Sequence, residues 1–252
     1  MLTATDVTVR YGGQTAVDRV SFSLEEGQWL MLVGPNGAGK SSLLHAVAQS
    51  VPHTGAIRLG DRDVRALRPA ELARQVGVLS QNNHVSYAYT VEEIVRLGRY
   101  AHAKGLFSSR DGEGDALVER ALELTGVEAL RHKSVLTLSG GELQRAFLAQ
   151  AFAQDPQILL LDEPANHLDL VYQKQIFSLI GQWLTKPGRA AVCVVHDLSL
   201  AKRFGTHALL MDRGQCVAKG SAQDVLTPDN LERVYGMDVY GWMQGLLGQW
   251  RE

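Results

Sequence analysis

The sequence predicts an α/β fold, in which a largely parallel sheet is flanked by helices and interrupted by a helical insertion. Three observations predict it. An apolar strand, a glycine-rich loop and a helix follow one another between residues 29 and 51. From residue 140 onward, helical patterns alternate with buried-looking apolar runs, which is typical of a doubly wound sheet. Between these parts, residues 90–133 show helical spacing and no obvious strand.

The first part of the chain contains short β-type runs before and after the glycine-rich loop. The segment from Ser41 to Val51 has its apolar residues at helical spacing, so it is predicted to be the helix that follows the loop. The predicted strands are Val7–Tyr11, Val20–Leu24, Trp29–Val33, Ala56–Leu59 and Val76–Ser80.

The helical block begins on Thr90, a residue that favours the N-cap position, in the stretch TVEEIVRLGRY. A second stretch, DALVERALELTGV, presents leucine and valine at helical intervals. We expect one domain over residues 1–236, with a helical insertion at about 88–137, and a separate tail over 237–252.

The core resumes with a helix after Gly141. Two apolar strands, Ile158–Asp162 and Ala190–Val195, enclose a predicted helix over Val171–Leu184. The runs HALLMD and QCVAKG form a predicted hairpin that turns over Arg213 and Gly214. Small helices are expected in the last thirty residues, and the aromatic residues of the tail either pack back onto the domain or form an interface.

The composition is that of a soluble globular protein, with 45% hydrophobic residues and a formal net charge of −2. This charge gives no global reason to expect nucleic acid as a partner. Cys193 and Cys216 lie in strand-like segments without metal-ligand spacing, so we expect inert packing thiols. The N-terminus has no basic and apolar leader, and no apolar run reaches the ~20 residues of a membrane span, so we expect a cytoplasmic protein.

The stretch GPNGAGKS, residues 34–41, fits the phosphate-binding pattern G-x-x-x-x-G-K-[ST] at every fixed position. It also follows a strand and precedes a helix, as that pattern requires. Its glycines let successive backbone N–H groups face a β-phosphate. Lys40 would reach the β and γ oxygens, and the Ser41 hydroxyl would bind Mg²⁺.

Two carboxylates, Asp162 and Glu163, end the apolar strand ILLLD, at the edge of a parallel sheet where ligands bind. Asp162 is the candidate Mg²⁺ ligand, and Glu163 is the candidate base that orients or deprotonates the attacking water. His196 ends the next strand. It is either a structural histidine or a hydrogen-bond donor to the γ-phosphate. Gln81 is either a contact to Mg²⁺ or water, or an ordinary loop residue.

A second cradle, LSGGE at 138–142, has Ser139, Gly140 and Gly141 at a helix N-terminus but no lysine. Such a cradle can complete the coordination of a γ-phosphate whose charge is already met elsewhere. Tyr11, at a predicted strand end, is either a packing residue or a face on which adenine stacks.

These residues resemble a known family, the nucleotide-binding subunits of ATP-binding cassette (ABC) transporters, over essentially the whole chain and in the family's order. The Walker A motif matches residues 34–42, the glutamine loop Gln81, the signature LSGGE, the Walker B motif ILLLDE and the switch histidine His196. The resemblance implies a phosphate-loop core with an N-terminal antiparallel β-subdomain and an inserted α-helical subdomain. The D-loop, Ala165 to Asp169, departs from the pattern, because many relatives have threonine and serine before the Leu-Asp pair.

The resemblance also implies the site. Glu163 and His196 would be catalytic, and Ser41, Gln81 and Asp162 would hold Mg²⁺. ATP would be bound by Tyr11, Gly34, Pro35, Asn36, Gly37, Ala38, Gly39, Lys40, Ser41 and Ser42, together with Ser139, Gly140 and Gly141 of a second copy in an ATP-dependent head-to-tail dimer.

Three stretches, TVEEIVRLGRYAH, NHLDL and GSAQDVLTPDNLERVYGMDV, resemble the ATPases of importers for iron-siderophore complexes, haem and cobalamin. This implies a place on the cytoplasmic face of the membrane, bound to permease subunits and served indirectly by a substrate-binding protein. The region from Gln81 into Thr90 and the following helix would receive the coupling helix of the permease. The alternatives are a non-transport ABC ATPase and a regulatory protein that binds ATP without turnover.

Overall fold

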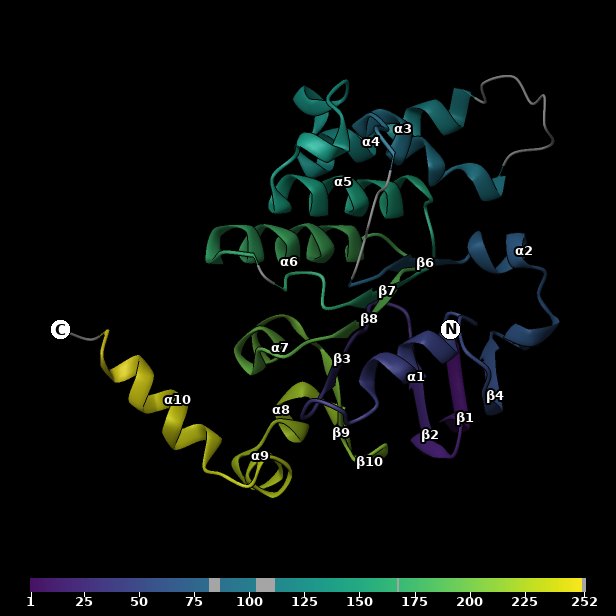
Figure 1. The fold of residues 1–252 in the computed structure, drawn as a ribbon. Coiled ribbons are helices and arrows are strands. Elements are labelled where there is room, and N and C mark those ends of the chain that lie inside the picture. Colours follow the sequence, from purple (N-terminus) through teal and green to yellow (C-terminus); the bar gives the residue numbers. More distant parts are fainter. Residues whose placement is uncertain (82–86, 103–111, 167, 251–252) are drawn as a thin grey trace. The chain divides into compact units, whose positions relative to one another are not determined.

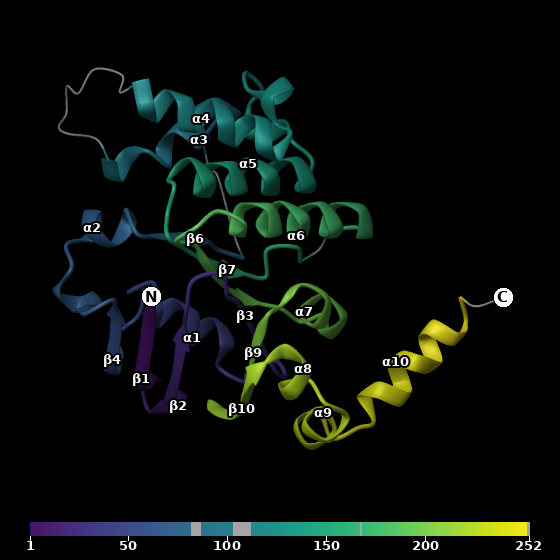
Figure 2. The same cartoon turned by 180° about the vertical axis from the view of Figure 1, so that it is seen from behind.

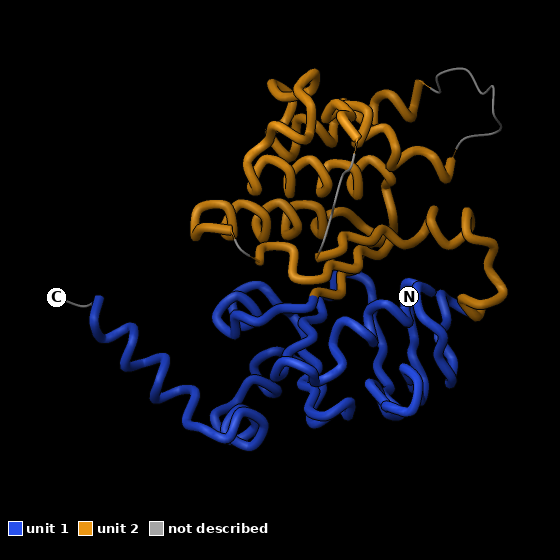
Figure 3. Tube along the Cα trace, viewed as in Figure 1, with its two compact units in different colours: residues 1–61, 194–252 blue, residues 62–193 orange. Residues whose placement is uncertain are grey.

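A computed structural model of the chain describes residues 1–81, 87–102, 112–166 and 168–250 (Figure 1). The chain divides into two compact units (Figure 3). Unit 1 contains residues 1–61 and 194–252, and unit 2 contains residues 62–193. The predicted α/β class, with an antiparallel N-terminal part and an all-helical part, is confirmed.

Unit 1 contains an antiparallel sheet in the order β2-β1-β4, formed by β1 (Leu2–Tyr11), β2 (Gln14–Leu24) and β4 (Thr54–Leu59). It also contains the strands β10-β9-β3, formed by β3 (Trp29–Val33), β9 (His207–Asp212) and β10 (Gln215–Ser221). β3 runs parallel to β9, and every residue of β3 is buried, which explains its unbroken apolar sequence.

The helices of unit 1 are α1 (Lys40–Val47), α7 (Leu198–Phe204), α8 (Ala222–Val225), α9 (Pro228–Tyr235) and α10 (Val239–Gly248). α10 extends beyond α9 in both views (Figures 1 and 2). α1 is shorter than the predicted Ser41–Val51. It ends because Gln49 adopts a left-handed φ of 58° and Pro52 follows, and a residue before proline avoids the helical region.

In unit 2, β6 (Val76–Leu79) runs parallel to β7 (Ile158–Asp162). The next strand in the sheet is β8 (Ala190–Val194), of which residues 190–193 belong to this unit. Its elements also include the short strand β5 (Arg62–Asp63) and the helices α2 (Pro69–Ala73), α3 (Val91–Leu97), α4 (Gly112–Thr125), α5 (Gly140–Ala153) and α6 (Leu170–Leu184).

Helices α3, α4 and α5 pack against one another (Figures 1 and 2). The predicted cap is confirmed, because the Thr90 side chain accepts from the Glu93 N–H, while the Glu93 carboxylate accepts from the Thr90 N–H at 2.7 Å. Two ion pairs hold α3. Arg96 of α3 pairs with Asp115 of α4, and Glu92 of α3 pairs with Arg131, which follows α4 in the chain. The helical block is thus held by caps and charges as well as by its core.

Neither cysteine forms a disulfide, and Cys193 is fully buried in β8. Burial raises the pKa of the half-buried Cys216 thiol, so both residues have the packing role that their sequence context predicts. Within the described part of the chain, none of the helices has both the length and the apolar character to cross a membrane.

Candidate functional site

The phosphate loop of unit 1 starts where β3 ends, and its shape requires glycine. Gly34, Gly37 and Gly39 have φ values of 144°, 79° and 94°, in the region that L side chains rarely adopt. A Cβ on Gly34 would lie 2.1 Å from the Met211 carbonyl oxygen, and one on Gly39 would lie 2.2 Å from the Ala16 carbonyl oxygen. The loop is therefore a backbone cradle fixed between β9 and β2, as the motif predicts.

Lys40 begins α1 and lies inside this cradle. Its Nζ donates to the carbonyl oxygens of Gly34 and Pro35, both at 2.8 Å, and the side chain is 5% exposed. The N-cap residue of α1 is Gly39, which offers no capping side chain, and the first turn contains no acidic residue. The helix end thus presents backbone N–H groups without a side-chain cap, with a cation held beside them, which is an arrangement that suits an anion.

We expect Gly39→Ala to lower the free energy of unfolding by roughly 3 kcal/mol, because a left-handed backbone is combined with a collision with the backbone of β2. Gly37→Ala is the matched control, since its φ is also positive but nothing lies within 4 Å of its added Cβ. The control is expected to cost only about 1 kcal/mol of strain. Urea unfolding of both variants measures the difference, and equal losses of stability would contradict the role of the β2 contact.

Two further predicted site residues lie in unit 1. Tyr11 ends β1, and its side chain is 49% exposed, so its ring has the exposure that stacking on a base requires. His196 is exposed and follows Val195, whose N–H donates to the Leu32 carbonyl oxygen at 3.2 Å. This bond pairs the chain just before His196 with the end of β3, the strand that leads into the phosphate loop.

Tyr235, the last residue of α9, is a neighbour of the loop that the sequence did not reveal. Burial raises the pKa of its hydroxyl, and the backbone amide of Gly34 partly opposes that rise. Its hydroxyl therefore lies close to the first residue of the cradle. The sequence shows only an aromatic residue before Gly236, with no sign of a partner some two hundred residues away.

The carboxylates of unit 2 lie at the end of β7, as predicted. Asp162 is 3% exposed and completes the strand, whereas Glu163 is half-buried and has a left-handed φ of 51°. Glu163 Oε2 accepts hydrogen bonds from Gln81 Nε2 at 2.7 Å and from Asn166 Nδ2 at 2.6 Å. The structure thus brings together two predicted site residues, Gln81 and Glu163, and adds a third, Asn166.

The second cradle lies at the N-terminus of α5, also in unit 2. The Ser139 N–H and hydroxyl both donate to Glu142 Oε2, each at 2.8 Å. These bonds hold the pKa of Glu142 below its usual value, the backbone N–H having the larger effect. Ser139 and Gly140 are exposed, while a Cβ on Gly141 would meet the Tyr172 ring at 2.8 Å. The cradle is therefore rigid and open on its outer side.

The surface predicted to receive a coupling helix is only partly described, because residues 82–86 lie outside the described residues. Among the residues around it that the structure describes, large apolar side chains are exposed. Tyr87 and Tyr100 have exposed fractions of 71% and 82%. Tyr89 and Leu97 are also exposed.

Metal binding was predicted at Ser41, Gln81 and Asp162. Ser41 belongs to unit 1, and the other two belong to unit 2. A hydroxyl, an amide oxygen and a carboxylate are hard oxygen donors, the chemistry that Mg²⁺ prefers. Over the described ranges, no group of three or more histidine, cysteine, aspartate or glutamate residues could hold a metal ion by itself.

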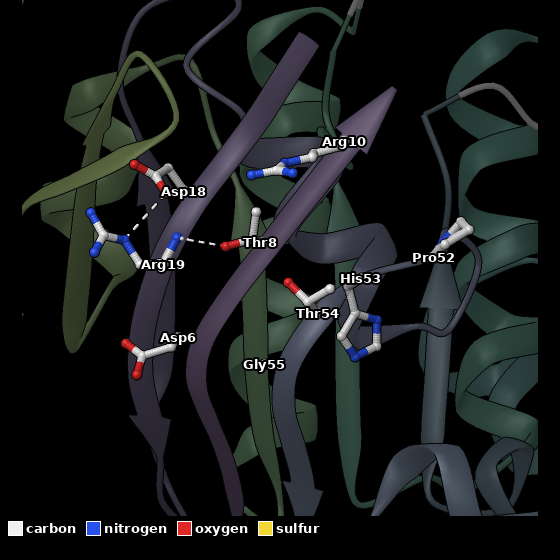
Figure 4. Close-up of a pocket in the computed structure, with 9 residues that line it drawn as sticks. All are labelled: Asp6, Thr8, Arg10, Asp18, Arg19, Pro52, His53, Thr54 and Gly55. Carbon is white, nitrogen blue, oxygen red and sulfur yellow. Dashed lines mark hydrogen bonds and ion pairs between the residues drawn. The ribbon is translucent and has the colours of Figure 1, made fainter. Parts of the chain in front are cut away.

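A cavity of about 740 Å³ in unit 1 lies elsewhere, at the β2-β1-β4 sheet (Figure 4). It is lined by residues of β1, β2 and β4 and by the segment before β4, where β1 and β2 pair with register shifts and Asp6 and Arg19 both have a left-handed φ of 49°. The Thr8 hydroxyl accepts from the Arg19 N–H at 3.0 Å. None of the predicted site residues lines this cavity.

Comparison with known proteins gives consistent matches. Residues 17–166 match the family described as ABC transporter. The chain is 40% identical over 230 residues to an uncharacterised ABC transporter ATP-binding protein, YvrA, of Bacillus subtilis, covering 91% of this chain and 52% of that relative's length. It is 34% identical to the ferric enterobactin transport ATP-binding protein FepC of Escherichia coli, covering 92% and 85% of the two chains.

A third relative is the hemin import ATP-binding protein HmuV of Pseudomonas entomophila, which is 39% identical over 95% of this chain and 94% of its own length. Among solved structures, an ATP-binding cassette in its ADP conformation has a TM-score of 0.81 at 22% identity, covering 93% and 98% of the two chains. A dimeric bacterial ABC transporter cassette has a TM-score of 0.78 at 26% identity, covering 88% and 99%.

Proposed function

Because the chain belongs to the ABC transporter family and is an ATPase of that type, as its motifs predicted, we propose that it is the ATP-hydrolysing subunit of a metal-chelate importer. Its cargo would be an iron-siderophore complex, haem or cobalamin. One observation carries the importer assignment: relatives aligned over most of both chains, FepC and HmuV, are transport and import ATP-binding proteins by name. The cobalamin alternative rests on motif resemblance alone.

In this function, the phosphate loop binds the β- and γ-phosphates of ATP through the backbone of residues 34–41 and through Lys40 Nζ. Tyr11 stacks on the adenine. Mg²⁺, when held by Ser41, Gln81 and Asp162, offsets the negative charge of the phosphate oxygens. Glu163 accepts a proton from the water that attacks the γ-phosphorus, ADP leaves with the electron pair of the broken P–O bond, and His196 donates to the γ-phosphate.

The second cradle is proposed to act on the ATP of another copy of this chain. Its exposed Ser139 and Gly140 lie at a helix N-terminus without a cation, so the cradle suits a phosphate already neutralised by Lys40. The Ser139 hydroxyl would exchange Glu142 Oε2 for a phosphate oxygen. In a dimer of this chain, the cradle of the first copy contacts the phosphate loop of the second copy. The cradle of the second copy contacts the phosphate loop of the first, so the two contacts together form a closed head-to-tail dimer. The dimeric cassette among the similar structures supports this arrangement.

Mixing two inactive variants tests this shared site. Lys40→Ala disables the loop, and Ser139→Arg places a bulky cation in the cradle. Each variant alone is expected to lack ATPase activity. In an equimolar mixture, heterodimers contain one intact loop facing one intact cradle, so activity returns to at most about one quarter of the unmodified level. Thermal unfolding of Ser139→Arg controls for loss of its cap. A mixture as inactive as its components would contradict the shared site.

We also propose that this protein works on the cytoplasmic face of the membrane through permease subunits. The exposed aromatic residues around Tyr87 and Tyr100 supply an apolar surface for their coupling helices. A substrate-binding protein would act on the other side of the membrane, and no nucleic acid is involved. Co-purification of a membrane subunit would separate this function from that of a non-transport ABC ATPase. A regulatory protein without turnover would leave ATP intact even when the unmodified chain is assayed.

A further inference from the structure

The carboxylate of Glu163 is held by two amide groups at once. Gln81 Nε2 and Asn166 Nδ2 donate to the same oxygen, Oε2, at 2.7 Å and 2.6 Å. The two donors come from distant parts of unit 2, since Gln81 follows β6 and Asn166 lies between β7 and α6. Such convergence on one oxygen fixes both the position and the rotation of the carboxylate.

Asn166 is bound to Glu163 through its backbone as well. Its N–H donates to the Glu163 carbonyl oxygen at 3.1 Å, which closes a turn over residues 163–166. The left-handed φ of Glu163, 51°, is part of that turn and is unfavourable for a side chain with a Cβ. A further bond supports the turn, from Gln144 Nε2 on α5 to the Pro164 carbonyl oxygen at 2.7 Å. Glu163 therefore lies in a strained turn that is stabilised by hydrogen bonds from Asn166 and Gln144.

The bonding pattern determines which carboxylate oxygen can take up a proton. An ionised carboxylate oxygen accepts at two lone pairs, and both lone pairs of Oε2 are engaged by amides. Proton uptake at Oε2 would require one amide to leave. The two bonds on Oε2 also set the direction of Oε1.

From these contacts we propose that Asn166 is a positioning residue for ATP hydrolysis, which holds the Glu163 carboxylate so that Oε1 meets the water. This rests on the proposed function, in which Glu163 is the base. The asparagine stands where many relatives have a shorter hydroxyl side chain. It acts on the reaction through Glu163.

The test compares the steady-state ATPase activity of Asn166→Asp and Asn166→Ala. Aspartate keeps the size of the side chain but replaces the N–H donor with an anion that repels Glu163. Positioning by hydrogen bonding predicts that kcat falls about tenfold to a hundredfold in Asn166→Asp and less in Asn166→Ala, with KM for ATP within about twofold of the unmodified value. A role of the side chain in packing alone predicts the reverse order.

Asn230→Asp is the matched control. Asn230 Nδ2 donates to the Val225 carbonyl oxygen at 3.0 Å in unit 1, so the substitution removes a similar bond away from Glu163. Its kcat is expected to stay unchanged. An Asn166→Asp variant with normal kcat would overturn the positioning role while leaving the ATPase intact. If the unmodified chain hydrolysed no more ATP than Lys40→Ala, the proposed function would be contradicted. The positioning role would then be contradicted as well.

Discussion

Replacing Glu163 by glutamine is expected to reduce ATP turnover by about 10²–10⁴-fold, the usual contribution of a positioned general base. An amide cannot take up the proton of the attacking water at neutral pH. The substitution preserves the shape of the side chain, and the new carbonyl oxygen can still accept from Gln81 and Asn166. The turn at the end of β7 is therefore expected to survive, and only the chemical step is lost.

Because the phosphate loop is unchanged in Glu163→Gln, ATP binding is expected to remain normal. The proposed ATP-bound dimer is then expected to accumulate, because loss of hydrolysis would keep ATP in its sites. Sedimentation velocity with and without ATP measures this, together with phosphate release. Glu128→Gln, an exposed carboxylate of the same unit, is the control and should hydrolyse ATP normally. Undiminished turnover in Glu163→Gln would remove the base assignment. A monomeric variant in saturating ATP would contradict dimer formation by the isolated chain.

Replacing Lys40 by alanine is expected to weaken ATP binding by roughly a hundredfold, because charge-assisted hydrogen bonds to phosphate oxygens contribute about 1.5–3 kcal/mol each. Lys40 Nζ donates to the carbonyl oxygens of Gly34 and Pro35. On binding, it can exchange these neutral acceptors for anionic oxygens. The loss should therefore appear mainly in nucleotide affinity.

Isothermal titration calorimetry with ATP measures the effect of Lys40→Ala. Lys174→Ala removes an exposed lysine from α6 in unit 2 and serves as the control, with an unchanged Kd. Urea unfolding without nucleotide tests whether the loop keeps its shape. A Kd within about threefold of the unmodified value would contradict the phosphate-loop assignment, because a single lost charge-assisted bond already exceeds that change.

Much of the fold follows from local pattern. β3 and β7 have the predicted bounds, because strands buried on both faces are continuous apolar runs. α1 ends earlier than predicted. The apolar residues keep helical spacing up to Val51, but Gln49 has a left-handed backbone and Pro52 follows, so the helix stops at Val47. α7 and α2 were not predicted, and α2, with five residues, contains too few turns for a clear apolar period.

The site is predictable only in part, for a related reason. A motif reports residues that are close in sequence, such as Gly39 and Lys40. The bond from Gln81 to Glu163 joins residues 82 positions apart, and nothing local in either segment specifies the other. The left-handed turn at Glu163 is equally hidden, because glutamate carries no preference for it. Asn166 was noticed as a departure from the family pattern, but its bond to Glu163 needed the structure.

The division of unit 1 between the two ends of the chain has a consequence for biosynthesis. β3 pairs with β9, and the Trp29 N–H donates to the Thr206 hydroxyl across 177 residues. At 5–20 residues per second, a ribosome needs on the order of ten to thirty-five seconds to add that segment. The phosphate loop is synthesised before unit 2, whereas Met211, whose carbonyl oxygen leaves no room for a Cβ at Gly34, is synthesised after it. The backbone contact between Gly34 and β9 can therefore form only once unit 2 has been made.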